Sequence, residues 1–360
     1  MRVVISAGGT GGHIYPALAI INKIKEHEPE STFLYIGTHN RMEKEIVPKE
    51  GIPFEAIEIY GIYRKKIYKN IKTLICYVKS GRTCKRLLKE FQPDIVIGVG
   101  GYVTAPVIKA AHKLGIKTFI HEQNSVPGAS NVYLSKIVDR IGVSLQSSMK
   151  EFPKEKCVFT GNPCGEGAKN APAIDKKELH LDPKKKLVLF VMGSLGSQKM
   201  NDILSKTMSL FKNKPYEVLY VTGKSYYEEV KKQTFPSNVK VVPYVENLPR
   251  VMKQTDVMVT RAGASTLSEI IALELPAILI PSPYVTNNHQ YKNAMDLVGA
   301  NAAVMVQEKD LHGDILVRKI DGLLKNEQQI RSIRTNLRGL GKKDSAEVIY
   351  REIKKLISKG

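Results

Sequence analysis

Short apolar runs recur along the chain, and each is followed by a turn and then by a helical pattern. Runs of this kind predict strands that are buried on both faces of a sheet. Strands that alternate with helical segments predict parallel α/β sheets. The runs lie at residues 3–5, 32–36, 117–120, 187–191, 217–222 and 277–280, and within residues 94–101 and 256–263.

The pattern is duplicated between the two halves of the chain, although the sequence itself is not. Each half opens with an apolar strand and a glycine turn, at residues 3–8 and 187–193. Each half then carries a second strand that ends in a glycine turn, within residues 94–101 and 256–263. Because 360 residues are too many for one ordinary core, we predict two doubly wound α/β domains.

The expected domains cover residues 1–162 and 163–340, because residues 161–172 have the Gly, Pro and small residues that are typical of a linker. Residues 341–360 are expected to form a C-terminal helix that packs back on the first domain. Asp344 and Glu347 have the spacing of a capping box at its start. One face of this helix is apolar and needs a partner surface; it carries Ala346, Ile349, Ile353 and Leu356.

The first glycine turn, at residues 8–13, favours a bound phosphate. Glycine lets backbone N–H groups approach a ligand, and the following helix points its positive end at the same place. The turn is not a dinucleotide fingerprint, because Ile14 occupies the third glycine position and the second strand ends in Gly37 and Thr38, without a carboxylate. The P-loop pattern is absent too. A turn that binds nothing stays the alternative for this loop taken alone.

The net charge implies an anionic partner. The chain has 55 Lys and Arg against 35 Asp and Glu, a formal net charge of +20. Between Arg64 and Lys89 every charged residue is basic, Lys72 and Lys79 among them. An apolar stripe with helical spacing runs through the same segment and consists of Ile67, Ile71, Leu74, Ile75 and Val78.

Three interpretations of this basic segment stay open. It is an ordinary surface helix whose apolar side is core, an interfacial helix that rests on anionic lipid, or a nucleic-acid contact. The last interpretation lacks a helix-turn-helix, zinc-finger or RNP pattern, so nucleic acid is not an expected partner.

The sequence carries no signal for membrane insertion or for a metal site. No segment approaches the length of an apolar membrane span, and the first apolar run is too short for the apolar region of a signal peptide. We therefore expect a cytosolic chain. Its four cysteines lack metal-ligand spacing and fit reduced thiols rather than zinc ligands or disulfides; they are Cys76, Cys84, Cys157 and Cys164.

Seven motifs, in order along the chain, resemble those of the MurG family. They are GGTGGH (residues 8–13), GVGGY (98–102), HEQN (121–124), GNP (161–163), GSLG (193–196), RAGASTLSE (261–269) and NHQYKNA (288–294). The family comprises the bacterial undecaprenyldiphospho-muramoylpentapeptide β-N-acetylglucosaminyltransferases of glycosyltransferase family 28. The resemblance implies the GT-B fold, in which two doubly wound, Rossmann-like parallel-sheet domains face a central cleft.

The resemblance also implies an activity. The expected reaction is inverting transfer of GlcNAc from UDP-GlcNAc to the C4 hydroxyl of MurNAc in lipid I. The product is lipid II, the precursor for peptidoglycan synthesis, so the expected roles are in cell-wall biogenesis, cell shape and cell division.

On the second domain the resemblance implies the residues that bind UDP-GlcNAc. Ser194 is similar to the family's pyrophosphate ligand, Glu269 to its ribose-binding carboxylate, and the backbone of Val245 to its uracil contact. Gln290, with His289 beside it, is similar to the side chain that reads the sugar hydroxyls. The family's wall beneath the ribose and phosphates corresponds in this chain to Ala264, Ser265, Thr266, Leu267 and Ser268.

On the first domain the resemblance implies a cradle for the acceptor diphosphate. Asn124 is similar to the family residue that reaches the transferred sugar, and the first turn is expected to contact UDP-GlcNAc as well. The cradle is formed by Thr10, Gly11 and Gly12 of the first turn together with Gly100, Gly101 and Tyr102.

His13 is the candidate general base for the C4 hydroxyl, because an imidazole exchanges protons near neutral pH. A His13 that only positions a phosphate is an equal alternative. Glu122 is the other nearby candidate, although a carboxylate that orients its own loop is the more typical role for it.

The chain departs from the family pattern on the donor side. Cys164 and Gly165 follow the GNP motif, where the family carries an arginine near the donor phosphates. Either Lys199 or Arg261 substitutes for this arginine, or the donor affinity is lower.

The resemblance gives the basic segment a role, since this part of the first domain touches the cytoplasmic membrane face in the family. We therefore expect a peripheral enzyme on the cytoplasmic side of the cell membrane. The expected partners are UDP-GlcNAc, lipid I and an anionic membrane surface, with cell-wall synthesis proteins as a further class. No cofactor or resident metal is expected, because no DxD-like carboxylate pair is present, although stimulation by divalent cations stays open.

Two rival functions stay open as well. One is another GT-B enzyme, such as a glycolipid glucosyltransferase or a non-hydrolysing UDP-GlcNAc epimerase, which donor specificity would separate. The other is a non-catalytic binder of anionic surfaces or nucleic acid. Such a binder would be indifferent to UDP-GlcNAc, and its affinity for nucleic acid would depend steeply on salt.

Overall fold

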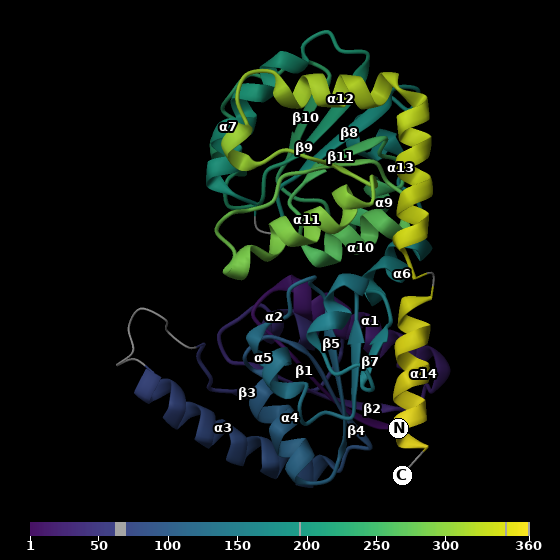
Figure 1. Cartoon of the computed structure of the whole chain (residues 1–360). Coiled ribbons are helices and arrows are strands. Elements are labelled where there is room, and N and C mark those ends of the chain that lie inside the picture. The colour runs from purple at the N-terminus through teal and green to yellow at the C-terminus, as the bar shows by residue number, and fades with distance from the viewer. Residues whose placement is uncertain (62–69, 194–195, 343, 359–360) are drawn as a thin grey trace. The chain divides into compact units, whose positions relative to one another are not determined.

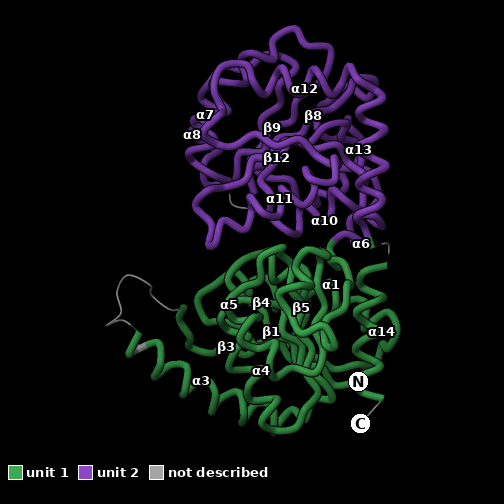
Figure 2. Tube along the Cα trace, viewed as in Figure 1, with its two compact units in different colours: residues 1–164, 342–360 green, residues 165–341 purple. Residues whose placement is uncertain are grey.

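The chain folds into two compact units in this computed structural model, which describes residues 1–61, 70–193, 196–342 and 344–358. Unit 1 comprises Met1–Cys164 and Lys342–Gly360, and unit 2 comprises Gly165–Gly341 (Figure 2). The chain thus passes from unit 1 to unit 2 after Cys164, slightly beyond the expected boundary at residue 162, and returns after Gly341.

Unit 1 is built on a parallel sheet of seven strands in the order β3-β2-β1-β4-β5-β6-β7. The strands are β1 (Arg2–Ala7), β2 (Thr32–Thr38), β3 (Phe54–Ile57), β4 (Ile95–Gly100), β5 (Lys117–Glu122), β6 (Arg140–Val143) and β7 (Cys157–Phe159). The helices are α1 (Gly11–His27), α2 (Glu43–Lys49), α3 (Asn70–Phe91), α4 (Thr104–Lys113), α5 (Ala129–Leu134), the 3-10 turn η2 (Gln146–Glu151) and α14 (Ser345–Ile357) (Figure 1).

Both faces of the unit 1 sheet are buried. Val4 joins a core with side chains of α3 and α4, whereas its neighbours Val3 and Ile5 join a second core with side chains of α1 and α14. Successive residues of a strand point to opposite faces, so the continuous apolar runs of the sequence follow directly from burial on both sides.

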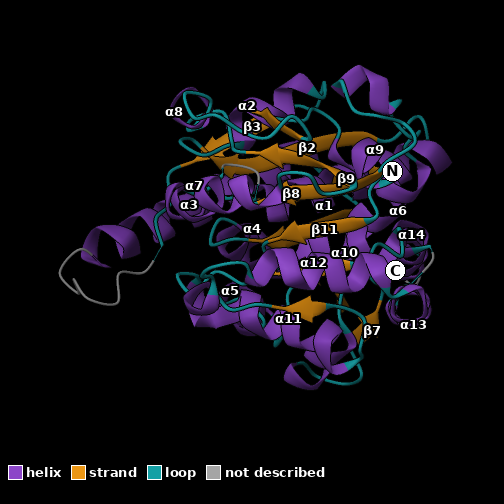
Figure 3. Cartoon of the chain, turned by 90° about the horizontal axis from the view of Figure 1, so that it is seen from above, coloured by secondary structure: helices purple, strands orange, loops and turns teal. Residues whose placement is uncertain are grey.

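Unit 2 repeats the architecture with six parallel strands in the order β10-β9-β8-β11-β12-β13. The strands are β8 (Lys186–Val191), β9 (Tyr216–Val221), β10 (Val239–Val242), β11 (Val257–Thr260), β12 (Ala277–Leu279) and β13 (Val304–Met305). Figure 3 shows the strands of the chain and the helices that connect them. The α-helices are α7 (Gln198–Met208), α8 (Tyr227–Val230), α9 (Leu248–Met252), α10 (Ala264–Ala272), α11 (His289–Gly299), α12 (Ile315–Lys325) and α13 (Glu327–Leu340), with 3-10 turns η3 (Lys176–Leu179), η4 (Ser209–Phe211), η5 (Thr286–Asn288) and η6 (Glu308–Asp310).

The strand orders confirm the prediction of two doubly wound sheets. In each sheet the order of the strands reverses once, between β1 and β4 in unit 1 and between β8 and β11 in unit 2. Ligands of doubly wound sheets bind outside the carboxyl ends of the strands at such a reversal. Each of the four glycine-containing turns singled out in the sequence follows one of these four strands.

The duplicated sequence pattern has a structural counterpart in two aspartates. The Asp94 carboxylate accepts a hydrogen bond from the backbone N–H of Arg2 at 2.7 Å, at the start of β1. The Asp256 carboxylate accepts one from the backbone N–H of Leu187 at 2.8 Å, near the start of β8. Each aspartate thereby links the chain just before the second strand of the pair to the beginning of the first.

The expected linker, residues 161–172, contains the passage from unit 1 to unit 2, and a helix, α6 (Pro163–Asn170), occupies most of it. The Asn162 side chain accepts a hydrogen bond from the backbone N–H of Cys164 at 3.1 Å, as an N-cap residue does. Proline is favoured at the first position of a helix. The Asn-Pro pair therefore starts a helix at this point of the chain.

The C-terminal helix α14 packs against α1, and Ile349 and Ile353 are fully buried in their shared core. The predicted capping box is wrong, since the side chain of Asp344 makes no capping hydrogen bond. Glu347 is instead paired with His27 at 2.6 Å, and the ring of His27 stacks on Tyr350 with 4.2 Å between centroids.

Helix α3 lies beside α4 (Figure 1). The apolar stripe of α3 is exposed. The exposed fraction is 67% for Ile71, 65% for Leu74, 52% for Ile75 and 48% for Val78. The interpretation in which this stripe is core is therefore wrong. Lys79 is exposed, whereas Ile67 and the side chain of Lys72 lie outside the described residues. The buried face of the helix carries small residues in its first part, followed by two leucines: Thr73, Cys76, Ser80, Cys84, Leu87 and Leu88.

The cysteines of the chain are free thiols, and all four are buried. Burial raises the pKa of Cys84 to about 12 and also raises that of Cys157. The predicted absence of disulfides holds for all four.

Candidate active site

The two glycine turns of unit 1 touch each other. The backbone N–H of Gly8 donates to the carbonyl of Gly100 at 3.2 Å. A Cβ on Gly101 would lie only 2.6 Å from the Gly8 carbonyl oxygen, and Gly101 has a φ of +87°, which favours glycine. Gly100 has a φ of +115° and is held by the Thr104 hydroxyl, which donates to its carbonyl at 2.9 Å. The structure thus brings both halves of the predicted acceptor cradle together.

His13 joins these two turns. Its Nδ1 lies 3.0 Å from the Gly8 carbonyl oxygen, and its ring lies so close to Gly100 that a Cβ there would come within 2.7 Å of Cδ2. A carbonyl oxygen only accepts, so Nδ1 must carry the proton in this contact. A neutral His13 therefore has its lone pair on Nε2, the nitrogen that a general base needs.

The remaining members of the cradle surround this contact. Thr10 is exposed and precedes α1 as its N-cap, but its side chain makes no capping hydrogen bond. Gly11 and Gly12 form the first turn of α1, whose end is positive. Tyr102 is half-buried against the core beneath α3 and α4.

Glu43 supports the first turn and is not among the site residues predicted from the sequence. This fully buried carboxylate accepts from the backbone N–H of Gly9 at 3.2 Å and from the Thr38 hydroxyl at 2.6 Å. The Gly9 amide is therefore occupied, whereas no hydrogen bond among the described residues engages the amides of Thr10, Gly11 and Gly12. The signal was faint: an acidic residue at the start of the helix that follows β2.

The contacts of Glu122 favour the role in which it orients its own loop over the role of a base. It is 2% exposed and accepts four hydrogen bonds, at 2.8–3.2 Å, from Asn124 N and Nδ2, Gly128 N and Asn131 Nδ2. These bonds fix the loop after β5 and hold Asn124 at its start. The neighbouring His121 is fully buried, and desolvation lowers its pKa to about 4, so it is neutral near pH 7.

The predicted donor residues of unit 2 lie at the carboxyl edge of its sheet. Glu269 is on α10, which follows β11, and burial raises its pKa to about 8 although part of its surface remains accessible. The Gln290 Oε1 accepts from the backbone N–H of Ser282 at 2.9 Å, which fixes the amide at the start of α11. Val245 lies half-buried in the segment after β10. Ser194 lies outside the described residues.

The predicted wall at the start of α10 is only partly available to a ligand. Leu267 is 1% exposed and belongs to the unit 2 core, so its side chain cannot line a ligand site. The Ser268 hydroxyl donates to the Ser265 carbonyl at 2.6 Å. Ala264, Ser265 and Thr266 are partly accessible in the first turn of the helix.

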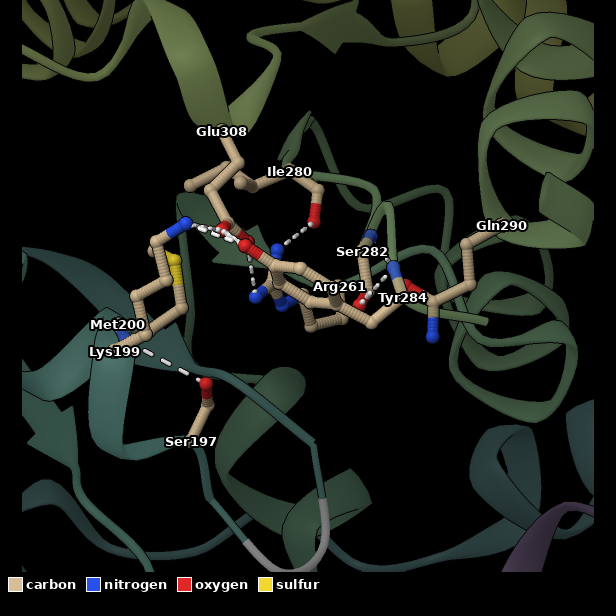
Figure 4. A network of polar contacts seen from close by, with 9 residues as sticks. All are labelled: Ser197, Lys199, Met200, Arg261, Ile280, Ser282, Tyr284, Gln290 and Glu308. Atoms are coloured by element: carbon tan, nitrogen blue, oxygen red, sulfur yellow. Dashed lines mark hydrogen bonds and ion pairs between the residues drawn. The ribbon is translucent and has the colours of Figure 1, made fainter. Parts of the chain in front are cut away.

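Arg261 forms a buried ion pair (Figure 4). Its Nη2 donates to Glu308 Oε2 at 2.6 Å, and its Nη1 donates to the Ile280 carbonyl at 3.1 Å. Burial acts to raise the pKa of Glu308, but hydrogen bonds from Lys199 and Arg261 hold it below its ordinary value, so the carboxylate stays charged. Arg261 is thus committed to the fold, which argues against its substituting for the missing arginine.

The structure explains why no arginine stands at Gly165. A Cβ there would lie 2.8 Å from the Ser268 carbonyl oxygen and 3.2 Å from the Ala272 Cβ, both on α10. Helix α6 approaches α10 so closely that glycine is required, and a longer side chain does not fit.

Within the described residues, no group of three or more His, Cys, Asp or Glu side chains is placed to hold a metal ion. No helix in that same part of the chain combines the length and apolarity of a membrane span.

Comparison with known proteins shows that both halves of the chain match domain models of the same protein family. The model of the glycosyltransferase family 28 N-terminal domain matches residues 3–143, and that of the family 28 C-terminal domain matches residues 187–349. The chain is 48% identical over 364 aligned positions to the UDP-N-acetylglucosamine--N-acetylmuramyl-(pentapeptide) pyrophosphoryl-undecaprenol N-acetylglucosamine transferase 1 of Bacillus cereus, with 100% of both chains covered. It is 46% identical to the corresponding transferase of Bacillus licheniformis, with 99% of each covered.

Solved structures match the fold of the chain over nearly its whole length. The crystal structure of Acinetobacter baumannii MurG matches with a TM-score of 0.78 and 26% identity, and the match covers 98% of this chain and 99% of that one. The S. aureus MnaA-UDP co-structure matches with a TM-score of 0.72 at 14% identity, over 99% of this chain and 97% of that one. At such low identity the second likeness shows the fold alone.

The close approach of α6 to α10 can be tested with two glycines of the same helix. Gly165→Ala should lower the free energy of unfolding by about 1–3 kcal/mol, because the new Cβ meets the Ser268 carbonyl oxygen. Gly167→Ala has no heavy atom within 4 Å of its Cβ and should raise stability by up to about 1 kcal/mol through helix propensity. Urea denaturation of both variants measures the difference, and equal effects would contradict the packing argument.

Proposed function

The chain belongs to glycosyltransferase family 28, and from this membership we infer that it is the N-acetylglucosaminyltransferase that converts lipid I to lipid II. GlcNAc passes from UDP-GlcNAc to the C4 hydroxyl of MurNAc in the undecaprenyl-pyrophosphoryl acceptor, with inversion. The observation that carries this conclusion is the full-length similarity to transferases whose names specify this donor and acceptor. The rival functions have no comparable support, because the epimerase structures match at 12–14% identity.

The acceptor side of the reaction fits the joined turns of unit 1. The amides of Gly11 and Gly12 at the positive end of α1 suit a diphosphate, which carries negative charge. His13 Nε2 then takes the proton of the C4 hydroxyl as the O4–C1 bond forms and the C1–O bond to UDP breaks. The bond from Nδ1 to Gly8 fixes both the tautomer and the orientation of the ring.

The donor side fits the carboxyl edge of the unit 2 sheet. Glu269 accepts from the ribose hydroxyls, and the Gln290 amide, anchored to Ser282, presents its NH2 group to the sugar hydroxyls. The start of α10 lies beneath the ribose and phosphates through its backbone and its small side chains. No metal or cofactor is required for these contacts, and this stays a prediction.

The proposed function is tested by measuring GlcNAc transfer from UDP-GlcNAc to a soluble lipid I analogue. His13→Asn retains a donor near the Gly8 carbonyl but removes the Nε2 base, so kcat should fall by about 100-fold or more. Binding of UDP, which needs no base, should be unchanged. A His13→Asn variant with near-normal turnover would remove His13 from the base role, and a wild-type chain that binds UDP-GlcNAc without transfer would refute the proposed acceptor.

The pH dependence of donor binding tests Glu269. Its pKa is raised to about 8, and ribose hydroxyls donate to the charged carboxylate, so UDP binds the deprotonated form better. Affinity should therefore rise by roughly eightfold from about pH 7 to about pH 8.5, with release of a proton on binding. Calorimetric titration with UDP measures both.

Two variants isolate this effect. Glu269→Gln should bind UDP weakly and without this pH dependence. Glu274→Gln, two residues beyond the end of α10, is the matched control. The hydrogen bond from Arg338 lowers the pKa of Glu274 below its ordinary value, so Glu274 does not titrate between about pH 7 and about pH 8.5. A wild-type affinity that is flat over this pH range would show that Glu269 does not bind the ribose.

We further propose that α3 rests on an anionic membrane surface. Its apolar stripe is exposed, and every charged residue from Lys72 to Lys89 is basic. Interfacial helices combine an apolar face with basic residues in this way. Lys109 of α4 lies 5.6 Å from the ring centroid of Tyr77 on α3 and 5.8 Å from that of Tyr133 on α5. Amphipathic tyrosines and a lysine thus continue the surface beyond α3, in the same unit as the proposed acceptor cradle. Proteins of cell-wall synthesis remain expected partners.

Replacement of the exposed stripe tests the membrane proposal. Ile71→Ser, Leu74→Ser and Ile75→Ser combined should reduce binding to phosphatidylglycerol vesicles by about 100-fold or more, because three aliphatic side chains no longer leave water. Transfer to a soluble acceptor should be retained. Leu210→Ser, at an exposed position of unit 2, should leave vesicle binding unchanged. Retained vesicle binding by the triple variant would contradict the proposal.

A further inference from the structure

One polar cluster of unit 2 consists of four side chains, each from the segment that follows one of four neighbouring strands. Lys199 follows β8, Arg261 follows β11, Tyr284 follows β12 and Glu308 follows β13. The carboxyl ends of parallel strands share one edge, so the cluster lies where doubly wound sheets bind ligands. Figure 4 shows the side chains of Lys199, Arg261 and Tyr284 converging on the Glu308 carboxylate.

The charges in this cluster do not cancel. The Arg261 and Glu308 side chains are 8% and 3% exposed and neutralise each other as a buried pair. Lys199 adds a second cation, whose Nζ lies 2.8 Å from the other carboxylate oxygen, Oε1. The four side chains therefore carry one net positive charge. This charge lies on Lys199, whose side chain is 57% exposed.

The Lys199 ammonium is held in place although it faces solvent. It donates to the Tyr284 hydroxyl, which in turn donates to Glu308 Oε1 at 3.1 Å. The ammonium also lies 5.1 Å from the Tyr284 ring centroid, within cation–π range. The bond to Glu308 raises the pKa of Lys199, so it stays protonated. An exposed lysine normally loses rotamer freedom when it binds a ligand, and these contacts have already removed much of that freedom.

The local backbone adds to the positive potential. Lys199 lies in the first turn of α7, whose N-cap Ser197 accepts from the backbone N–H of Met200 at 3.5 Å. The first-turn amides of a helix and its dipole favour an anion at this end. Gly196, just before the N-cap, packs on the end of β9, since a Cβ there would lie 2.3 Å from the Thr222 carbonyl oxygen. This anchors the start of α7 to the sheet edge.

We propose that Lys199, held by Glu308 and Tyr284, binds the diphosphate of the UDP donor and stabilises the departing UDP. The inference rests on the proposed function, which supplies the diphosphate. As the C1–O bond breaks, its electron pair passes to the β-phosphate oxygen, and the negative charge on UDP grows. A nearby fixed cation stabilises that charge more in the transition state than in the bound donor. Glu308 does not oppose this role, because Arg261 neutralises it.

The experiment compares the binding of UDP and uridine by calorimetry in Lys199→Met. Loss of a charge-assisted hydrogen bond should weaken UDP binding by about tenfold or more. Uridine lacks the diphosphate, so its affinity should be unchanged. Lys199→Arg should retain most of the UDP affinity. Lys206→Met removes the same charge from the exposed face of the same helix and should alter neither affinity.

Two further readouts separate binding from structural support. The kcat for GlcNAc transfer by Lys199→Met should fall along with kcat/KM, because the stabilised charge develops in the transition state. Tyr284→Phe keeps the ring but removes the hydroxyl that contacts Nζ, so it should weaken UDP binding less than Lys199→Met and leave uridine binding unchanged.

The outcomes distinguish this inference from the proposed function. Unchanged UDP affinity in Lys199→Met overturns the inference, and so does an equal loss of UDP and uridine affinity, which would mean that Lys199 only supports the fold. A wild-type chain that transfers GlcNAc normally under either result leaves the proposed function standing. A wild-type chain that binds neither UDP nor UDP-GlcNAc overturns both.

Discussion

Parallel pairing of β1 with β4, and of β8 with β11, is the constraint on which the rest of the structure depends. Backbone hydrogen bonds of these pairs align the strands in one direction, so the turns that follow them emerge at one edge of each sheet. In unit 1 this brings Gly8 within hydrogen-bond distance of Gly100 and sets His13 against both turns. In unit 2 the same alignment gathers Lys199 and Arg261 around one carboxylate. The chemistry of each unit is therefore assembled by its sheet and not by any single motif.

Much of this could be predicted from the sequence because the signals are local. A strand buried on both faces is a continuous apolar run, and a turn that needs positive φ selects glycine. The runs near residues 3, 95, 187 and 257 are strands, and Gly9, Gly100, Gly101 and Gly193 have positive φ. The family motifs are local as well, because each is a short continuous segment of the sequence.

The parts that the sequence did not predict depend on contacts between distant residues. Glu43 reaches the Gly9 amide from another helix, and Glu308 reaches Arg261 across 47 positions of the chain. The outward stripe of α3 has the same periodicity as a buried one, and only the packing of the helix beside α4 shows which side is buried. Gly165 is a glycine because of the carbonyl of Ser268, which no local pattern records.

The buried thiols have a consequence for spectroscopy. All four native cysteines are buried, which limits the access of maleimides to their thiols. Burial also raises the pKa of Cys84 to about 12, so the reactive thiolate of this residue is scarce at neutral pH. A single cysteine introduced on the exposed face of α3 or on α7 is therefore the thiol that reacts fastest. A fluorophore or spin label can be attached there with the native cysteines in place, which makes the surroundings of α3 or of α7 observable during turnover.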